Sequence, residues 1–233
     1  MNFKFGFFLF FFFLLSCGKN IQDENLSIFR YNQASGIATL DPAFAKDQAT
    51  IWACNQLFSG LVQLNNNLEV MPSIAKSWEI SEDGLDYTFF LQKNVFFHAH
   101  PIFEKERRVV ASDFTYSFDR LKSKQLAAPG TWVLSNVESY KAINDSTFEI
   151  NLQKPFPPFL GLLSMQYCSV VPKEIMKNTN FRENPIGTGP FQFQYWKDGV
   201  KLVFRKNPNY FEKQEGVQLP FLDAIAITFI KDK

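Results

Sequence analysis

A tight-turn signal at Asp83-Gly84, set between two apolar segments, constrains the fold of this chain more than any other feature. Glycine adopts the backbone angles of a tight turn at no steric cost. On both sides of the turn, apolar residues recur at the even spacing of one strand face: Ile74, Trp78 and Ile80 before it, and Tyr87, Phe89 and Leu91 after it. This alternation predicts an antiparallel pair of strands with one buried face.

The apolar period changes after the hairpin. The second arm continues through Val95-Phe96-Phe97 into a short charged segment, and Phe114, Phe118 and Leu121 then follow at i, i+4 and i+7. That spacing places them on one face of a helix, which we expect over residues 111–121. Ser112 and Asp113 are positioned to cap its first turn and to complement the helix dipole.

The rest of the chain also alternates between strand and helix signals. A helix is expected over residues 47–58, ended near Ser59-Gly60, and a second hairpin is expected about Asn144-Asp145. Gly187-Thr188-Gly189 is followed by strand composition and not by a helix, which argues against a phosphate cradle. Further strands are predicted over residues 27–32, 61–64, 68–70, 137–143, 147–152, 167–171, 191–196, 200–205 and 224–230, and short helices about residues 160–163 and 172–176.

The N-terminus has the form of an export signal. Lys4 precedes an apolar run over residues 5–15, which is too short for a transmembrane helix and fits a secretory signal. Leu14-Leu15-Ser16-Cys17 looks like a lipobox, so residues 1–17 are predicted to be a lipoprotein signal peptide, with Cys17 as the lipidated residue. An ordinary signal peptide cut near Ser16 is the alternative. Residues 18–26 are then a polar tether.

Cysteine and histidine pairs raise two further alternatives. Export would permit a disulfide between Cys54 and Cys168, but cysteines in apolar helical and extended patterns are often small buried residues. His98 and His100 point the same way in an extended segment, a spacing that a metal could use. A third ligand of the same kind does not follow, and the charged segment after them is more typical of a solvated loop. We therefore expect no metal site and no cofactor.

The charge balance excludes one class of partner. The chain has 24 basic and 23 acidic residues and no long basic run. Nucleic-acid binding would require a basic patch to neutralise phosphates, so we expect no nucleic-acid partner.

Two long motifs occur in the order that one family of proteins shows. The first includes Pro72-Ser73-Ile74-Ala75-Lys76-Ser77-Trp78, Ser81-Glu82-Asp83-Gly84, Tyr87-Thr88-Phe89 and Ala111-Ser112-Asp113-Phe114; the second includes Asn184-Pro185-Ile186-Gly187-Thr188-Gly189-Pro190-Phe191 and Arg205-Lys206-Asn207-Pro208-Asn209-Tyr210. They resemble the signature of the extracellular solute-binding proteins of family 5, the dipeptide, oligopeptide and nickel receptors of bacterial ATP-driven (ABC) importers. Ala99-His100-Pro101 departs from the pattern, because relatives usually have Asp-Gly after the first histidine.

This resemblance implies an α/β fold: a periplasmic-binding-protein-like lobe of class II type, with mixed β-sheets and flanking helices, whose second lobe is missing. Residues 27–60 would form the first segment of domain I, residues 61–165 a domain II-like subdomain, and residues 166–233 the return to domain I. Relatives continue for roughly as long again or more, so the chain is expected to be a binding-impaired fragment.

The same resemblance implies a function without catalysis. Such a lipoprotein would sit in the cell envelope, held to the membrane by its N-terminal lipid, and would pass peptides or similar solutes to an importer permease. Gly36, Ile37, Ala38 and Thr39 are the candidates for main-chain contact with the ligand, and a plain connecting loop is the alternative. Two other functions stay open: a structural or surface lipoprotein that keeps the fold without transport, and a secreted hydrolase, for which no Gly-x-Ser-x-Gly or His-Glu-x-x-His motif appears.

Overall fold

The computed structural model describes residues 26–177 and 180–230. The predicted signal peptide, residues 1–17 with Cys17, lies outside the described residues, and so does the predicted tether apart from Leu26. Within the described ranges, none of the helices combines the length and the apolar character that a membrane crossing needs.

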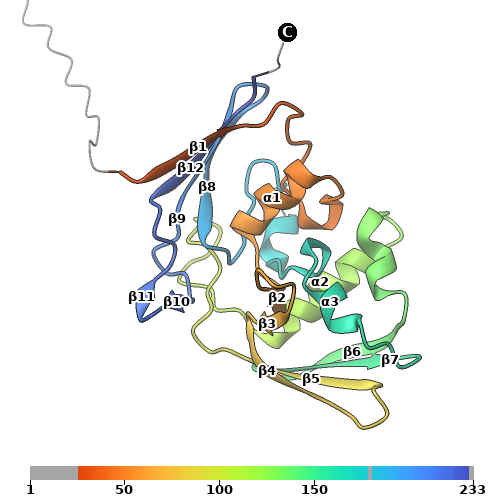
Figure 1. Cartoon of the computed structure of the whole chain (residues 1–233). Helices are drawn as coiled ribbons and strands as arrows, with labels where there is room; N and C mark the ends of the chain where they lie inside the picture. Colours follow the sequence, from red (N-terminus) through yellow and green to blue (C-terminus); the bar gives the residue numbers. More distant parts are fainter. Residues whose placement is uncertain (1–25, 178–179, 231–233) are drawn as a thin grey trace, which may run out of the picture.

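The first of two four-stranded sheets joins the two ends of the described chain (Figure 1). Its strand order is β1-β12-β9-β8, with β1 parallel to β12 and the other pairs antiparallel, so the sheet is mixed as predicted. The strands are β1 (Ile28–Asn32), β8 (Phe191–Lys197), β9 (Lys201–Lys206) and β12 (Ala224–Thr228).

The second sheet is built from the middle of the chain and is antiparallel throughout, in the order β4-β5-β7-β6. Its strands are β4 (Ala75–Ile80), β5 (Asp86–Leu91), β6 (Val137–Asn144) and β7 (Thr147–Leu152). Two small hairpins complete the strands: β2 (Val62–Leu64) with β3 (Val70–Pro72), and β10 (Lys213–Gln214) with β11 (Val217–Gln218).

Helices cover these sheets and connect them (Figure 1). The α-helices are α1 (Gln48–Leu57), α2 (Ala111–Lys122) and α3 (Phe159–Leu163), and the 3-10 turns are η1 (Pro42–Phe44), η2 (Pro129–Leu134), η3 (Gln166–Cys168) and η4 (Lys173–Lys177). The helix α2 packs across β6 and β7, whereas α1 contacts β8. At the start of α2 the carboxylate of Asp113 accepts a hydrogen bond from the Val110 N–H at 2.9 Å, so Asp113 caps the first turn as predicted, and Val110, not Ser112, is the N-cap residue.

The hairpin at Asp83-Gly84 forms as predicted, but its two arms are buried differently. Gly84 adopts a φ of +69°, and Tyr87, Phe89 and Leu91 of β5 are buried. In β4, however, Trp78 is half-buried and Ile80 is 44% exposed. The reason is sheet position, because β4 is an edge strand with a bulge between Ala75 and Ser77.

The predicted strand over residues 167–171 is wrong. The chain there forms the 3-10 turn η3 and then an extended segment outside any sheet, although Cys168, Val170 and Val171 are buried as expected of a buried strand. Val170 N–H donates to Ser59 O at 3.0 Å, which pairs the segment with a loop instead of with a strand. A short apolar run gives the same sequence signal whether it forms a buried strand of a sheet or a buried extended segment outside any sheet.

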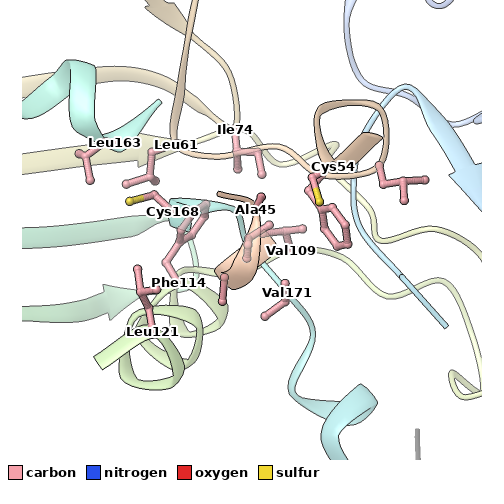
Figure 2. Packing of buried hydrophobic residues seen from close by; sticks show 14 of the residues in the cluster. Ala45, Cys54, Leu61, Ile74, Val109, Phe114, Leu121, Leu163, Cys168 and Val171 are labelled. Atoms are coloured by element: carbon pink, nitrogen blue, oxygen red, sulfur yellow. The ribbon is translucent and has the colours of Figure 1, made fainter. Parts of the chain in front are cut away.

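One continuous hydrophobic core runs beneath both sheets, and part of it is drawn in Figure 2. Phe118 lies edge-on to Phe148 with ring centroids 5.6 Å apart, which joins α2 to β7. Cys54 and Cys168 are both buried free thiols, and Figure 2 shows them on opposite sides of Ala45. The structure therefore supports the buried-residue interpretation and not the disulfide.

A clasp made by one histidine and two glycines connects the segment before α2 to the loop before β8. The Nε2–H of His98 donates to Gly189 O at 3.1 Å, and Nδ1 accepts from the Gly187 N–H at 3.2 Å. Gly189 N–H in turn donates to Leu57 O at 2.9 Å, at the end of α1. The Gly-Thr-Gly loop is thus a junction between three segments.

Candidate ligand-binding site

The predicted contact residues, Gly36 to Thr39, form a loop between β1 and η1 whose two ends are fixed. Gly36 enters it with a φ of +71°, a conformation that glycine adopts without strain. At the other end, Thr39 Oγ1 accepts a hydrogen bond from the Asp41 N–H at 3.0 Å, and Asp41 Oδ1 accepts one from the Ala43 N–H at 3.1 Å to begin η1. The loop is therefore held at both ends.

Between these ends the main chain has no internal partners. Among the described residues, nothing forms a hydrogen bond with the N–H or C=O groups of Ile37, Ala38 or Thr39. Ile37 is buried through its side chain, Ala38 is exposed, and Gly36 and Thr39 are half-buried. Main-chain groups almost always find a partner in protein, water or ligand, so this run of free donors and acceptors is available to a bound molecule.

The loop borders an open hollow of about 340 Å³. Its lining residues are Gln33, Ser35, Gly36, Ile37, Ala38, Asp47, Gln48 and Ala49. Three of the four predicted residues thus lie at one hollow, whereas Thr39 serves to fix the loop.

The first turn of α1 forms the other side of the hollow, and the sequence analysis did not assign it to the site. Asp47 was predicted only as the first residue of the helix over residues 47–58, and in the structure it caps α1: Oδ1 accepts from the Thr50 N–H and Oδ2 from the Thr50 hydroxyl, both at 2.9 Å. Each Asp47 oxygen already accepts one hydrogen bond, and the exposed Gln48 amide and the free main chain offer further polar groups to a ligand.

The two histidines that were considered as a metal pair, His98 and His100, both use their ring nitrogens in hydrogen bonds. Both ring nitrogens of His98 are used in the clasp, and its side chain is buried, which corrects the expectation of a solvated loop at this residue. His100 Nε2 bonds to Asn184 Oδ1 at 2.7 Å, and its Nδ1 accepts from the Ile102 N–H at 3.1 Å. In the part of the chain that the structure describes, no three His, Cys, Asp or Glu residues are grouped to hold a metal ion.

Comparison with known proteins bears on the fold and on the resemblance of the two motifs. The model of the family described as bacterial extracellular solute-binding proteins, family 5 middle, matches residues 69–233, which confirms the resemblance of the two motifs. The dipeptide-binding protein of Escherichia coli strain K12 is 31% identical over 195 residues, which make up 76% of this chain and 36% of that protein.

Solved structures agree with the fold. The periplasmic binding protein DppA of Helicobacter pylori, in complex with the peptide STSA, is 28% identical with a TM-score of 0.78, over 90% of this chain and 44% of that chain. NikZ of Campylobacter jejuni, in complex with Ni(L-His), is 30% identical with a TM-score of 0.72, over 88% of this chain and 39% of that chain. These matches support a class II binding-protein lobe, and the chain spans less than half the length of each of these relatives.

Proposed function

Because the chain belongs to the bacterial extracellular solute-binding proteins of family 5, we propose that it forms the ligand-capturing lobe of a substrate-binding protein for an ABC importer. The proposed ligand is a peptide or a similar small solute. The relatives support this class, since one is a dipeptide-binding protein and another was solved with the peptide STSA. The proposal contains no catalytic step.

One observation carries the proposal: the free main chain of Ile37, Ala38 and Thr39 beside an open hollow. An extended peptide can pair with such a segment as an added strand, so that its main chain supplies the affinity. Its side chains would project into the hollow beside Gln48, where space and water tolerate different residues. This mode suits a receptor that accepts many sequences.

Residues 27–60 and 166–233 would then act as domain I and residues 61–165 as the attached subdomain, an arrangement consistent with the origin of the strands in each sheet. In periplasmic binding proteins two lobes close on the ligand about a hinge. A single lobe buries little of a ligand and leaves its outer groups in water. We therefore expect this chain alone to bind peptides weakly, and micromolar or tighter binding by calorimetry would contradict that expectation.

Amide chemical shifts of the isotopically labelled full chain, titrated with Ala-Ala and Ala-Ala-Ala, test the site directly. We expect shifts at residues 36–39 and at Gln48. Ala38→Pro removes one N–H that makes no internal hydrogen bond, so it should weaken the response, while Ala38→Val keeps the N–H and should retain it. An unresponsive loop in the wild-type chain would overturn the proposal, and equal losses in the two variants would overturn the main-chain contact.

Membrane anchoring through Cys17 is a separate part of the proposal. It rests on the lipobox-like Leu14-Leu15-Ser16-Cys17, and several acyl chains would hold the mature protein firmly at the membrane surface, in the cell envelope. The precursor should take up labelled fatty acid, and Cys17→Ser should not. Equal labelling of the two would leave an ordinary signal peptide cut near Ser16.

An importer permease is the proposed protein partner. Capture of a permease by the tagged, membrane-anchored chain would support the receptor function. Peptide-independent binding to envelope material, without a permease, would instead favour a structural or surface lipoprotein. Cleavage of a peptide during the titrations would point to the hydrolase alternative.

A further inference from the structure

A second hollow, of about 410 Å³, opens between the end of α1, β2 and the segment that follows η3. Its volume lies within the range of ordinary small-ligand pockets. Most of its polar lining consists of hydroxyl and amide groups, from Asn55, Gln56, Ser59, Gln63, Ser73, Ser164, Gln166 and Ser169. The predicted loop Gly36–Thr39 is not part of it.

Three serines in this lining are buried, yet their hydroxyl groups have no hydrogen-bond partner among the described residues. Ser59, Ser73 and Ser169 are 9%, 3% and 6% exposed. Their main chains are fixed nearby: Ser59 O accepts from the Val170 N–H at 3.0 Å, and Ser73 O accepts from the Gln92 side chain at 2.6 Å. No hydrogen bond joins any of the three hydroxyls to another described residue, and none of the three oxygens is fully sealed from solvent.

Unpartnered hydroxyls at buried residues are costly unless something in the cavity satisfies them. Each hydroxyl can donate one hydrogen bond and accept two. Three of them come from separate segments, and the exposed Asn55 side chain, whose Oδ1 already accepts from Gln166 Nε2, adds an NH₂ group as donor in the same lining. A water cluster or a polar ligand would satisfy them.

The lining also defines the charge of that ligand. Among the described residues, no charged side chain lines this hollow. The carboxylate of Glu212 lies behind the wall, where it accepts from Gln63 Nε2 at 2.8 Å, and burial raises the pKa of Glu212. A carboxylate or an ammonium group would find no opposite charge here, so an uncharged amide or hydroxyl group fits best.

The outer face of α1 connects the two hollows. Gln48 borders the first and Asn55 borders the second, and Trp52, which is 50% exposed, lies between them at helical spacing on the same face. Seven residues of helix span about 10 Å. An extended peptide covers that length with about three residues.

From this arrangement we infer that the second hollow is a subsite for an uncharged amide- or hydroxyl-bearing part of the peptide whose main chain pairs with the Gly36 loop. The inference rests on the proposed function and narrows its ligand. The preferred peptide has four or more residues, and its distal residues are polar and uncharged. A dipeptide is too short to reach from one hollow to the other.

The amide shifts of the full chain test the subsite with three peptides: Ala-Ala, Ala-Ala-Ala-Asn-Ser-amide and Ala-Ala-Ala-Asp-Glu. We expect all three to shift residues 36–39, and only the pentapeptide with the uncharged Asn-Ser-amide end to shift Ser59, Ser73 and Ser169 as well. Each of Ser73→Ala and Ser169→Ala should weaken pentapeptide binding about threefold to tenfold, as expected for one lost hydrogen bond, and leave Ala-Ala unaffected. Ser139→Ala, on the exposed face of β6, is the matched control and should change neither.

The outcomes separate the subsite from the proposed function. A response at residues 36–39 without one at the three serines would overturn the subsite and leave the peptide-binding loop standing. If no peptide shifts the amides of residues 36–39, both the subsite and the peptide-binding loop are wrong. Glucose serves as a further probe: if glucose shifts the three serines and the amidated pentapeptide does not, the hollow binds free polyols and the subsite is wrong.

Discussion

Arg120 of α2 binds both carboxylate oxygens of Asp41, a residue 79 positions earlier at the end of the Gly36 loop. Nη1 donates to Oδ1 at 3.0 Å and Nη2 donates to Oδ2 at 2.5 Å. The two side chains are only 9% and 11% exposed. Because Asp41 also begins η1, this ion pair fixes the candidate ligand loop against the helix that covers the second sheet.

Replacing Arg120 by Leu should therefore lower the free energy of unfolding by about 3–5 kcal/mol, because Asp41 would remain as a buried charge without a partner. The guanidinium also stacks on the Phe181 ring at 4.8 Å, a contact that the variant changes too. Arg108→Leu is the matched control: its pair with Asp145 is exposed and should contribute about 0–1 kcal/mol. Equal urea midpoints for the two variants would show that the buried pair has no special role.

The His98 clasp should make stability depend on pH. Burial lowers the pKa of His98 from 6.5 to about 4, because the protein interior disfavours the charged ring; the hydrogen bond to Gly189 O acts in the opposite direction and the charge of Arg205 in the same one. Between the pKa of His98 in the unfolded state and its lower pKa in the folded state, His98 binds a proton when the protein is unfolded but stays neutral when it is folded. The free energy of unfolding should then fall by about 3 kcal/mol as the pH drops from about 6.5 to about 4.

Urea unfolding across this pH range, compared between wild type and His98→Gln, isolates the effect, because the carboxyl groups titrate similarly in both. The variant should be less stable at neutral pH and should lose most of the difference near pH 4. A difference between wild type and His98→Gln that does not change with pH would contradict a neutral, buried ring.

Local sequence signals predicted most of the helices and strands, but not where each lies in a sheet or what its backbone pairs with. The strand β5 was found from its alternation, and the same signal misjudged Ile80, because a sequence does not show which strand will lie at the sheet edge. Residues 167–171 were predicted as a buried strand, and residues 168–171 are buried, yet Val170 pairs with a loop instead of a sheet.

The candidate site shows the same limit. Gly36 to Ala38 were identified through the family resemblance, whereas the hollow also needs the first turn of α1, which only the tertiary structure brings beside them. Asp47 was identified only as the start of a helix, so its position beside the hollow was not predicted. The clasp between His98 and the Gly187 loop joins residues about 90 positions apart, and no local pattern predicts such a contact.

The two glycines of that loop should be irreplaceable for steric reasons. A Cβ on Gly187 would lie 2.0 Å from Leu57 O, and one on Gly189 would lie 2.6 Å from the Leu57 carbonyl carbon. Both neighbours are backbone atoms at the end of α1 and cannot rotate away. Gly187→Ala should thus cost about 3 kcal/mol or more in the free energy of unfolding, as in strongly overpacked sites.

Gly161→Ala is the matched control for this clash. Gly161 lies in α3, and a Cβ there meets no atom within 4 Å. Alanine has the higher helix propensity, so this variant should be neutral or stabilised by up to about 1 kcal/mol. Thermal unfolding of the two variants side by side checks the contrast, and similar melting temperatures would refute the close approach of the loop to α1.

The buried thiols allow a last prediction, best made in the Cys17→Ser chain so that only two cysteines remain. Burial raises the pKa of the Cys168 thiol to about 12 and also raises that of Cys54. Since the thiolate is the reactive form, neither residue should react with Ellman's reagent in the folded protein at mildly alkaline pH. In concentrated urea without reductant both should react. Thiols that appear in urea only after a reductant is added would mean that the two cysteines are joined, whereas rapid reaction in the folded state would mean that the core around α1 and η3 opens.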